Sequence, residues 1–107
     1  MWHLMSLRIG SVHFNRAMYD GVHDVLYLGA GEPRRAVWTD VTDDGHALRY
    51  AENGRLIGLN IVGAARLMES DDEIRVGAFT LRASDVAPLI EEERRRTISV
   101  PSAATSE

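Results

Sequence analysis

The sequence predicts an α+β fold: an antiparallel β-meander of about five strands or more, with a C-terminal helix packed on the sheet. Three observations predict it. Short apolar runs with period-two alternation fill the first two thirds of the chain. The dipeptides Asp44-Gly45 and Asn53-Gly54 separate two of these runs. From Ser84 onward the apolar spacing changes to that of a helix.

The two glycine dipeptides predict tight hairpin turns. Each pairs a residue that tolerates positive φ with a glycine, which adopts it at little steric cost. A two-residue type I′ turn needs this combination, so we expect type I′ turns at both places. The glycines stand nine positions apart, which leaves room for one strand and one turn. This spacing predicts a meander in which neighbours along the chain also pair in space.

The strand pattern is weak at the start of the chain and clear later. Residues 1–11 are mildly apolar and predict no definite element, and Met1 or Met5 can each be the start. Residues 12–19 alternate roughly and predict a first strand, followed by a turn over 20–24. Residues 25–28 are apolar on both faces, which is typical of a well-covered strand.

Three further strands follow in the predicted meander. Residues 35–41 alternate, and Leu48 and Tyr50 share a face of the next strand. The clearest alternation follows the second glycine turn and predicts one buried face and one lighter, partly polar face. The buried face consists of Ile57, Leu59 and Ile61.

The remainder of the chain predicts mixed elements. Residues 63–68 fit a short helical turn, and 71–72 form a solvated break. Residues 73–82 contain two apolar pieces that fit either a tight hairpin or one bulged strand. Ser84 is a candidate N-cap for the final helix, whose apolar stripe consists of Val86, Leu89 and Ile90.

These elements predict a single domain over residues 1–97. It divides into a β-meander core over 12–68 and an extension over 69–97, made of a hairpin or strand plus the helix. Residues 98–107 are rich in Ser, Ala and Thr and show no period, so we expect a disordered tail.

The composition limits the classes of partner. The 107-residue chain has 45% hydrophobic content, as in a small globular domain. No apolar run approaches the about 18 residues of a membrane span, so no membrane partner is expected. A net charge of −4 disfavours nucleic acid. The absence of cysteine excludes disulfides and thiolate chemistry, and it is compatible with a reducing cytoplasm, where we expect the protein.

Candidate metal ligands lie at the ends of the predicted turns. They are His23, Asp24, Asp20 and His46. No ligands stand at a compact metal-binding spacing, and Asp is favoured in turns because its side chain bonds the nearby backbone. The serines lack the strand–turn–helix context of a nucleophile. We therefore expect no metal, no cofactor and no catalytic residues.

Aromatic side chains are the candidate interface residues. Tyr27, Trp38 and Tyr50 could anchor a partner, since aromatic residues carry much of the energy of interfaces. Ordinary core packing is the alternative for each of them. The basic run 94–96 fits the last turn of a helix, where cations stabilise the helix dipole, and contact with phosphate or an acidic partner is its alternative.

Two segments resemble a known family. Residues 19–28 read Tyr-Asp, a short spacer, and an Asp before an apolar-apolar-Tyr-apolar strand. This looks like the opening of the small prokaryotic domains grouped as domain-of-unknown-function family 2283. Residues 54–62 are similar to the closing strand of that family, although Asn60 stands where the family has an acidic residue. The acidic penultimate strand of the family is also replaced, by residues 49–51.

The resemblance covers roughly residues 12–68 and implies a compact, β-rich bacterial domain without assigned catalytic residues. Some members of such families look like antitoxin partners of small toxins.

Together these features predict a non-enzymatic protein-interaction module that forms a homo-oligomer or binds a small protein partner. An antitoxin-like role is implied by the resemblance alone. The physical reason for an interaction role is that a small sheet has edges that must be covered, paired or charged. The alternative function is a small-molecule or metal-binding domain that uses the turn-end His and Asp residues.

Overall fold

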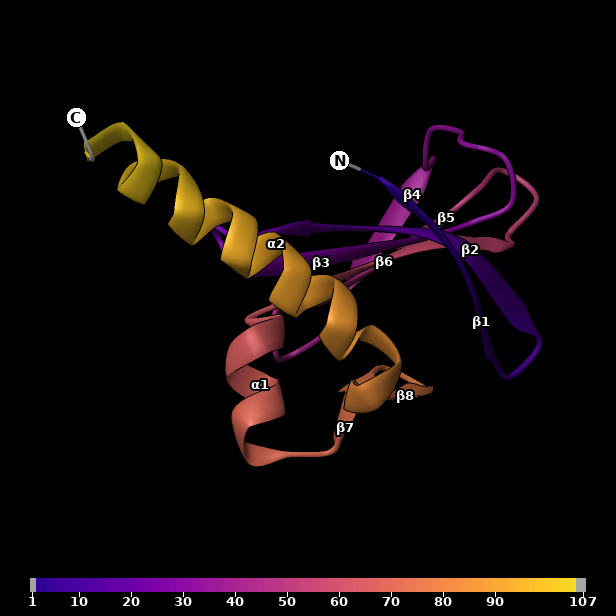
Figure 1. Cartoon of the computed structure of the whole chain (residues 1–107). Helices are drawn as coiled ribbons and strands as arrows, with labels where there is room; N and C mark the ends of the chain where they lie inside the picture. Colours follow the sequence, from indigo (N-terminus) through magenta and orange to yellow (C-terminus); the bar gives the residue numbers. More distant parts are fainter. Residues whose placement is uncertain (1, 106–107) are drawn as a thin grey trace.

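The computed structural model describes the backbone of residues 2–105 and the side chains of residues 2–96. Six strands of the described chain form one antiparallel sheet, and α2 lies across one side of it (Figure 1). The predicted α+β fold is therefore confirmed. The elements are, in order, β1 (His3–Ile9), β2 (Val12–Asp20), β3 (Val25–Ala30), β4 (Trp38–Val41), β5 (Ala47–Tyr50), β6 (Leu56–Val62), α1 (Ala64–Ser70), β7 (Glu73–Val76), β8 (Phe79–Arg82) and α2 (Ala83–Thr105).

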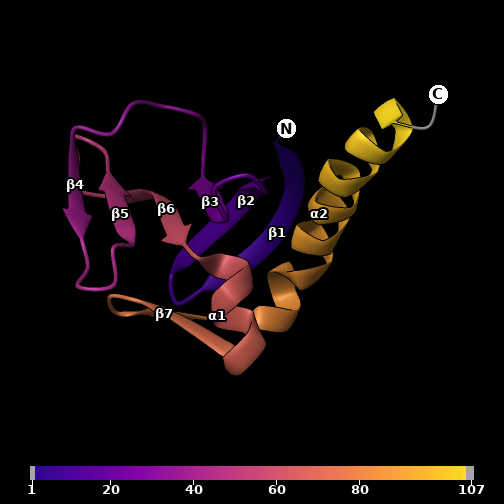
Figure 2. The same cartoon turned by 90° about the vertical axis from the view of Figure 1, so that its left-hand side faces the viewer.

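The six-stranded sheet joins two three-stranded meanders. Its strand order is β1-β2-β3-β6-β5-β4. Neighbours along the chain pair within each meander, as expected, but β3 pairs with β6 instead of β4. The connection over 31–37 carries the chain past two strands to the far edge (Figure 2). Strands β3 to β6 thus have Greek-key order, and β1 and β4 are the two edge strands.

The glycine turns differ from the predicted type I′ geometry. A type I′ turn needs positive φ at both central residues. Gly45 has a φ of 89° and Gly54 a φ of 83°, but neither Asp44 nor Asn53 has a positive φ. The type I′ prediction is therefore wrong, because only the glycine of each dipeptide is left-handed.

Both turns are three-residue loops with a left-handed glycine at the bulge. Gly45 N–H donates to the Thr42 carbonyl at 2.9 Å, and Thr42 N–H donates to the His46 carbonyl at 2.8 Å. This is a type I turn closed by a G1 bulge. Residues 51–55 repeat the same pair of hydrogen bonds.

Strand β1 lies in the N-terminal segment for which the sequence predicted no element. It pairs with β2 from His3↔Ala17 to Ile9↔Val12, with a register shift between Leu4 and Leu7. Buried or half-buried residues alternate with exposed ones along the whole strand.

The core lies between the sheet and a second layer formed by α1, α2 and the β7–β8 hairpin (Figures 1 and 2). The predicted buried face of β6 is confirmed, since all three of its members are buried. The fully buried large side chains of the sheet are Phe14, Leu26, Leu28, Leu59 and Ile61, and those of the second layer are Ile74, Val76, Val86 and Ile90.

The opposite side of the sheet is called here the open face. By the strand registers it carries a row Leu4–Arg16–Gly29–Gly58–Arg49–Thr39 and a parallel row Met18–Tyr27–Asn60–Ala47–Val41. The side chains of these two rows are exposed or half-buried, glycines aside.

The second layer confirms one prediction and resolves another. Helix α1 occupies the place of the expected helical turn. Residues 73–82 form the hairpin rather than the bulged strand. Helix α2 begins at Ala83, whose N–H donates to the Asp72 carbonyl at 2.7 Å. Ser84 consequently lies inside the helix, and the prediction that it is the N-cap is wrong.

The predicted disorder of 98–107 concerns residues whose side chains lie outside the described part of the chain, so it stays a prediction. Neither helix has, over its described residues, both the length and the hydropathy that a bilayer span requires.

Candidate functional site

The turn between β2 and β3 contains three of the predicted metal ligands, and two of them close the turn itself. Asp20 Oδ1 accepts the N–H groups of Val22 and His23 at 3.0 and 3.2 Å. Asp20 Oδ2 lies 2.8 Å from His23 Nδ1. These hydrogen bonds from His23 lower the pKa of the Asp20 carboxyl. The pair therefore forms an Asx turn with a side-chain hydrogen bond of its own.

Asp24 stabilises the start of α1. The helix begins after Gly63, which has no side chain to cap it, and its first turn contains no acidic residue. Asp24 Oδ1 accepts the Ala65 N–H at 2.8 Å, and Oδ2 accepts the Arg66 N–H at 3.3 Å. The Gly63 N–H donates to the Asp24 carbonyl at 2.7 Å. Asp24 thus supplies from a distant turn the cap that the local sequence lacks.

The Asp24 carboxylate also binds a tyrosine. Tyr19 Oη donates to Asp24 Oδ1 at 2.6 Å. Burial and this hydrogen bond raise the pKa of the Tyr19 hydroxyl. Burial would raise the pKa of Asp24, but its hydrogen bonds from Tyr19 and the α1 backbone outweigh burial and lower it. Asp24 also has a left-handed backbone, with a φ of 55°, a conformation that Asp tolerates better than most residues.

His46 is buried at the start of β5, with 2% exposure. Its Nδ1 accepts the Val62 N–H at 3.0 Å. That bond places the proton of the neutral imidazole on Nε2. A cavity of about 400 Å³ adjoins His46 and is lined by charges of both signs, including Arg66, Asp71 and Arg75. The ring therefore pins the end of β6 and leaves its other nitrogen for a further contact.

The four predicted ligands do not form one metal site. Asp20 and His23 bind each other, Asp24 binds α1, and His46 binds β6. Within the described residues, no group of three or more His, Asp or Glu side chains is placed to hold a metal ion. The geometry therefore assigns three separate hydrogen-bonding roles to these residues.

The three aromatic interface candidates lie in two places. Trp38 and Tyr50 pair across β4 and β5, with ring centroids 5.0 Å apart and an interplanar angle of 36°. Tyr50 packs against the core, while Trp38 is 53% exposed at the sheet edge. Tyr27 is half-buried in the middle of the open face. Only Trp38 thus presents a largely exposed ring.

The β4 edge exposes more apolar surface than the aromatic pattern predicted. All four of its residues are exposed. Val41 is 69% exposed, and Val37, just before the strand, is 58% exposed. The neighbouring Asp40 accepts the indole N–H of Trp38 at 3.2 Å. Sequence reasoning missed this edge because strand order decides which strand is outermost.

A serine–histidine pair lies on the β1–β2 hairpin. Ser6 Oγ and His13 Nε2 are 2.7 Å apart. His13 and Arg34 both line a surface cavity of about 500 Å³. No carboxylate hydrogen-bonds His13 in the described part of the chain, so the pair lacks the third group that orients a catalytic histidine. The β1 bulge, which brings Ser6 near His13, left no signal in the sequence.

No protein-family model matches the chain, and no curated protein or solved structure is similar to it.

Proposed function

We propose that this protein is a non-enzymatic interaction module that self-associates by pairing β4 with β4 of a second copy. The observation that carries the proposal is the uncovered edge of the sheet. Monomeric proteins usually protect an edge strand with lysines, prolines or a covering loop. β4 exposes Trp38 and Val41 and has Asp40 as its one charge.

The backbone of β4 supports pairing at this edge. The Thr42 N–H bonds the His46 carbonyl of the facing strand. Because hydrogen-bonded pairs alternate in an antiparallel ladder, Asp40 and Trp38 also direct their backbone groups toward β5. Thr39 and Val41 therefore direct theirs toward the free edge.

A two-fold axis at Thr39 makes the edge self-complementary. Thr39 then faces Thr39 of the second copy, a favourable cross-strand pair, while the Val37 N–H stays bonded to the Tyr50 carbonyl of β5 at 2.8 Å. Trp38 faces Asp40 of the second copy, to which its indole N–H can donate in place of its own Asp40. The Trp38–Asp40 contact occurs twice and the Thr39 pair lies on the axis, as a closed two-fold dimer requires.

The expected dimer is weak. A pairing of so few residues buries less than the roughly 1,200 Å² that stable specific interfaces bury. We therefore expect a reversible equilibrium with a dissociation constant of about 10–100 μM.

Sedimentation velocity across a concentration series tests the proposal. The wild type should shift from monomer to dimer. Thr39→Pro removes an N–H that points to the free edge and leaves the β4–β5 bonds in place, so it should stay monomeric. Thr39→Val keeps the N–H and is the matched control, which should dimerise like the wild type.

If Thr39→Pro unfolds, the double variant Val37→Lys, Val41→Lys provides the same test by charge repulsion across the edge. A wild type that stays monomeric at every concentration contradicts the proposal, as does a Thr39→Pro variant that dimerises normally. The antitoxin-like role implied by the resemblance predicts a different occupant of this edge, a strand of a small toxin. The antitoxin-like role therefore predicts that the purified wild type stays monomeric at every concentration.

A further inference from the structure

Two arginines face each other across a pair of glycines on the open face. Arg16 of β2 pairs with Gly29, Gly29 pairs with Gly58, and Gly58 pairs with Arg49 of β5. One row of four strands therefore has an arginine at each end and no side chain between them. We call this row the arginine–glycine row.

Both arginines extend toward the glycines. A Cβ added to Gly29 would lie 2.6 Å from Arg16 Cζ, so the guanidinium occupies the space above that glycine. A Cβ added to Gly58 would lie 3.5 Å from a terminal nitrogen of Arg49. Paired Cα atoms of neighbouring strands are about 4.5–5.5 Å apart. The two guanidinium groups thus lie near neighbouring glycines of one row.

The row has no internal counter-charge. Within the described residues, neither Arg16 nor Arg49 makes an ion pair with a carboxylate. One terminal nitrogen of Arg16 donates to the Asn15 side chain and the Gly31 carbonyl, both neutral acceptors. The two positive guanidinium groups above the glycines repel each other, and an anion bound between them offsets that repulsion.

An exposed aromatic ring beside the row is suited to another part of a ligand. Trp2 lies over the Arg16 guanidinium, with Cζ 5.4 Å from its ring, and is 46% exposed. Its free ring surface can stack on a planar group.

We propose that the open face binds the phosphate of a small phosphorylated ligand between Arg16 and Arg49. Phosphate fits because guanidinium groups bind it through paired, charge-assisted hydrogen bonds of about 2.8 Å. The aromatic ring of Trp2 beside Arg16 fits the base of a nucleoside monophosphate. This site is independent of the proposed β4 dimer.

Nuclear magnetic resonance titration tests the proposal, because amides of Gly29 and Gly58 lie directly under the site. At low protein concentration, inorganic phosphate up to about 10 mM should shift these two amides and the side-chain Nε–H of both arginines. Adenosine monophosphate should bind at least about threefold more tightly through ring stacking. Trp2→Ala should remove that advantage, so that adenosine monophosphate binds no more tightly than inorganic phosphate.

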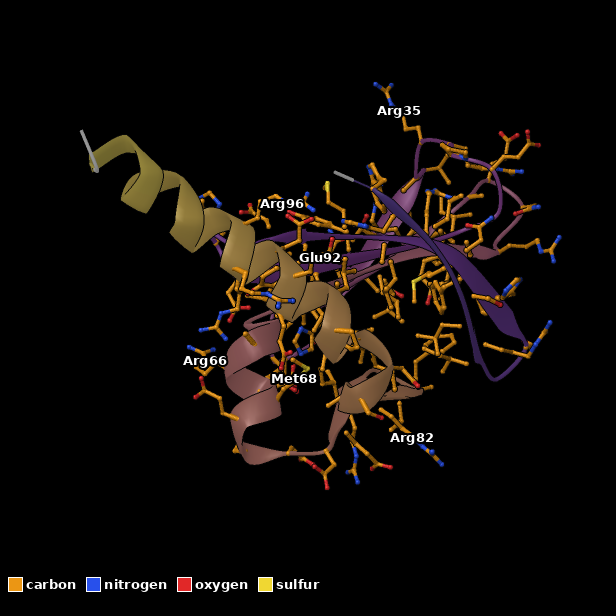
Figure 3. All side chains as sticks on the ribbon, viewed as in Figure 1. Arg35, Arg66, Met68, Arg82, Glu92 and Arg96 are labelled. Atoms are coloured by element: carbon orange, nitrogen blue, oxygen red, sulfur yellow. The ribbon has the colours of Figure 1, made fainter. Side chains whose placement is uncertain are left out.

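Arg16→Gln and Arg49→Gln should each weaken phosphate binding at least about tenfold, because each removes half of the charge. Arg82→Gln is the matched control, since Arg82 lies on β8 and projects away from the sheet (Figure 3). Gly29→Ala should also abolish binding by displacing Arg16, while its amide spectrum reports whether the fold persists.

Absence of shifts at both glycines at the highest phosphate concentration overturns the proposal. Equal loss in the Arg82→Gln control also overturns it, because the effect would then reflect net charge. A short single-stranded oligonucleotide that displaces adenosine monophosphate through both arginines would instead assign the row to nucleic acid.

Discussion

The Asp24 carboxylate accepts the backbone N–H of Ala65 at 2.8 Å, across 41 residues of sequence. Through this bond the β2–β3 turn holds the first turn of α1. A residue that the sequence suggested as a metal ligand is therefore the cap of a helix in the second layer. It also positions the helix on the end of the sheet, next to the core residues Ala64 and Ala65.

Replacement of Asp24 should destabilise the protein. Asp24→Ala removes the cap and the Tyr19 acceptor and places alanine at a positive φ, so we expect a loss of about 2–4 kcal/mol in the free energy of unfolding. Tyr19→Phe removes one of these bonds and should cost about 1 kcal/mol. Urea denaturation measures both. An Asp24→Ala variant as stable as Tyr19→Phe would contradict the capping role.

The same carboxylate makes stability depend on pH. Its folded pKa is lower than its unfolded pKa, so its stabilising effect is complete above the unfolded value and is lost as the pH falls through the folded value. Wild-type stability should therefore decline below about pH 4. Asp24→Asn should reduce that decline in thermal melts between acidic and neutral pH. Asp43→Asn changes an exposed turn carboxylate and should leave the slope as in the wild type.

Substitutions at Asp44 and Gly45 in the first glycine turn distinguish a G1 bulge from a type I′ turn. Gly45→Ala forces alanine into a φ of 89°. Apart from the two neighbouring residues, no atom lies within 4 Å of the added Cβ, so the cost is backbone strain of about 1–2 kcal/mol. Asp44→Ala should cost less than about 0.5 kcal/mol, because Asp44 is not left-handed. Chemical denaturation of both variants checks this. Equal costs at the two positions would favour the type I′ geometry.

His46 should contribute to stability through one hydrogen bond and its packing. His46→Phe removes the acceptor for Val62 and leaves a part-buried N–H unpaired, which costs about 1–2 kcal/mol. His13→Phe changes an exposed histidine and should cost less than about 0.5 kcal/mol. A His46→Phe variant with wild-type stability would show that Val62 finds another acceptor.

Local pattern was sufficient for most elements of the fold. The alternation over Ile57, Leu59 and Ile61 predicted the buried face of β6 because side chains of a strand alternate with a period of two. The apolar stripe of the last helix likewise marked its buried positions, Val86 and Ile90. The strand β1 was not predicted, although Met5, Leu7 and Ile9 alternate with exposed residues along it.

Strand order and the sites that depend on it were decided by tertiary structure alone. Nothing local in the sequence specifies that β3 pairs with β6, yet this pairing makes β4 an edge and brings Gly29 beside Gly58. It also brings Arg16 and Arg49 to opposite ends of one row. The sequence by itself determined most of the strand segments after residue 11 and which side of β6 is apolar, because those properties depend on neighbours along the chain. Contacts between distant segments, such as Asp24 with α1, depend on how the whole sheet closes its core, which no short-range pattern contains.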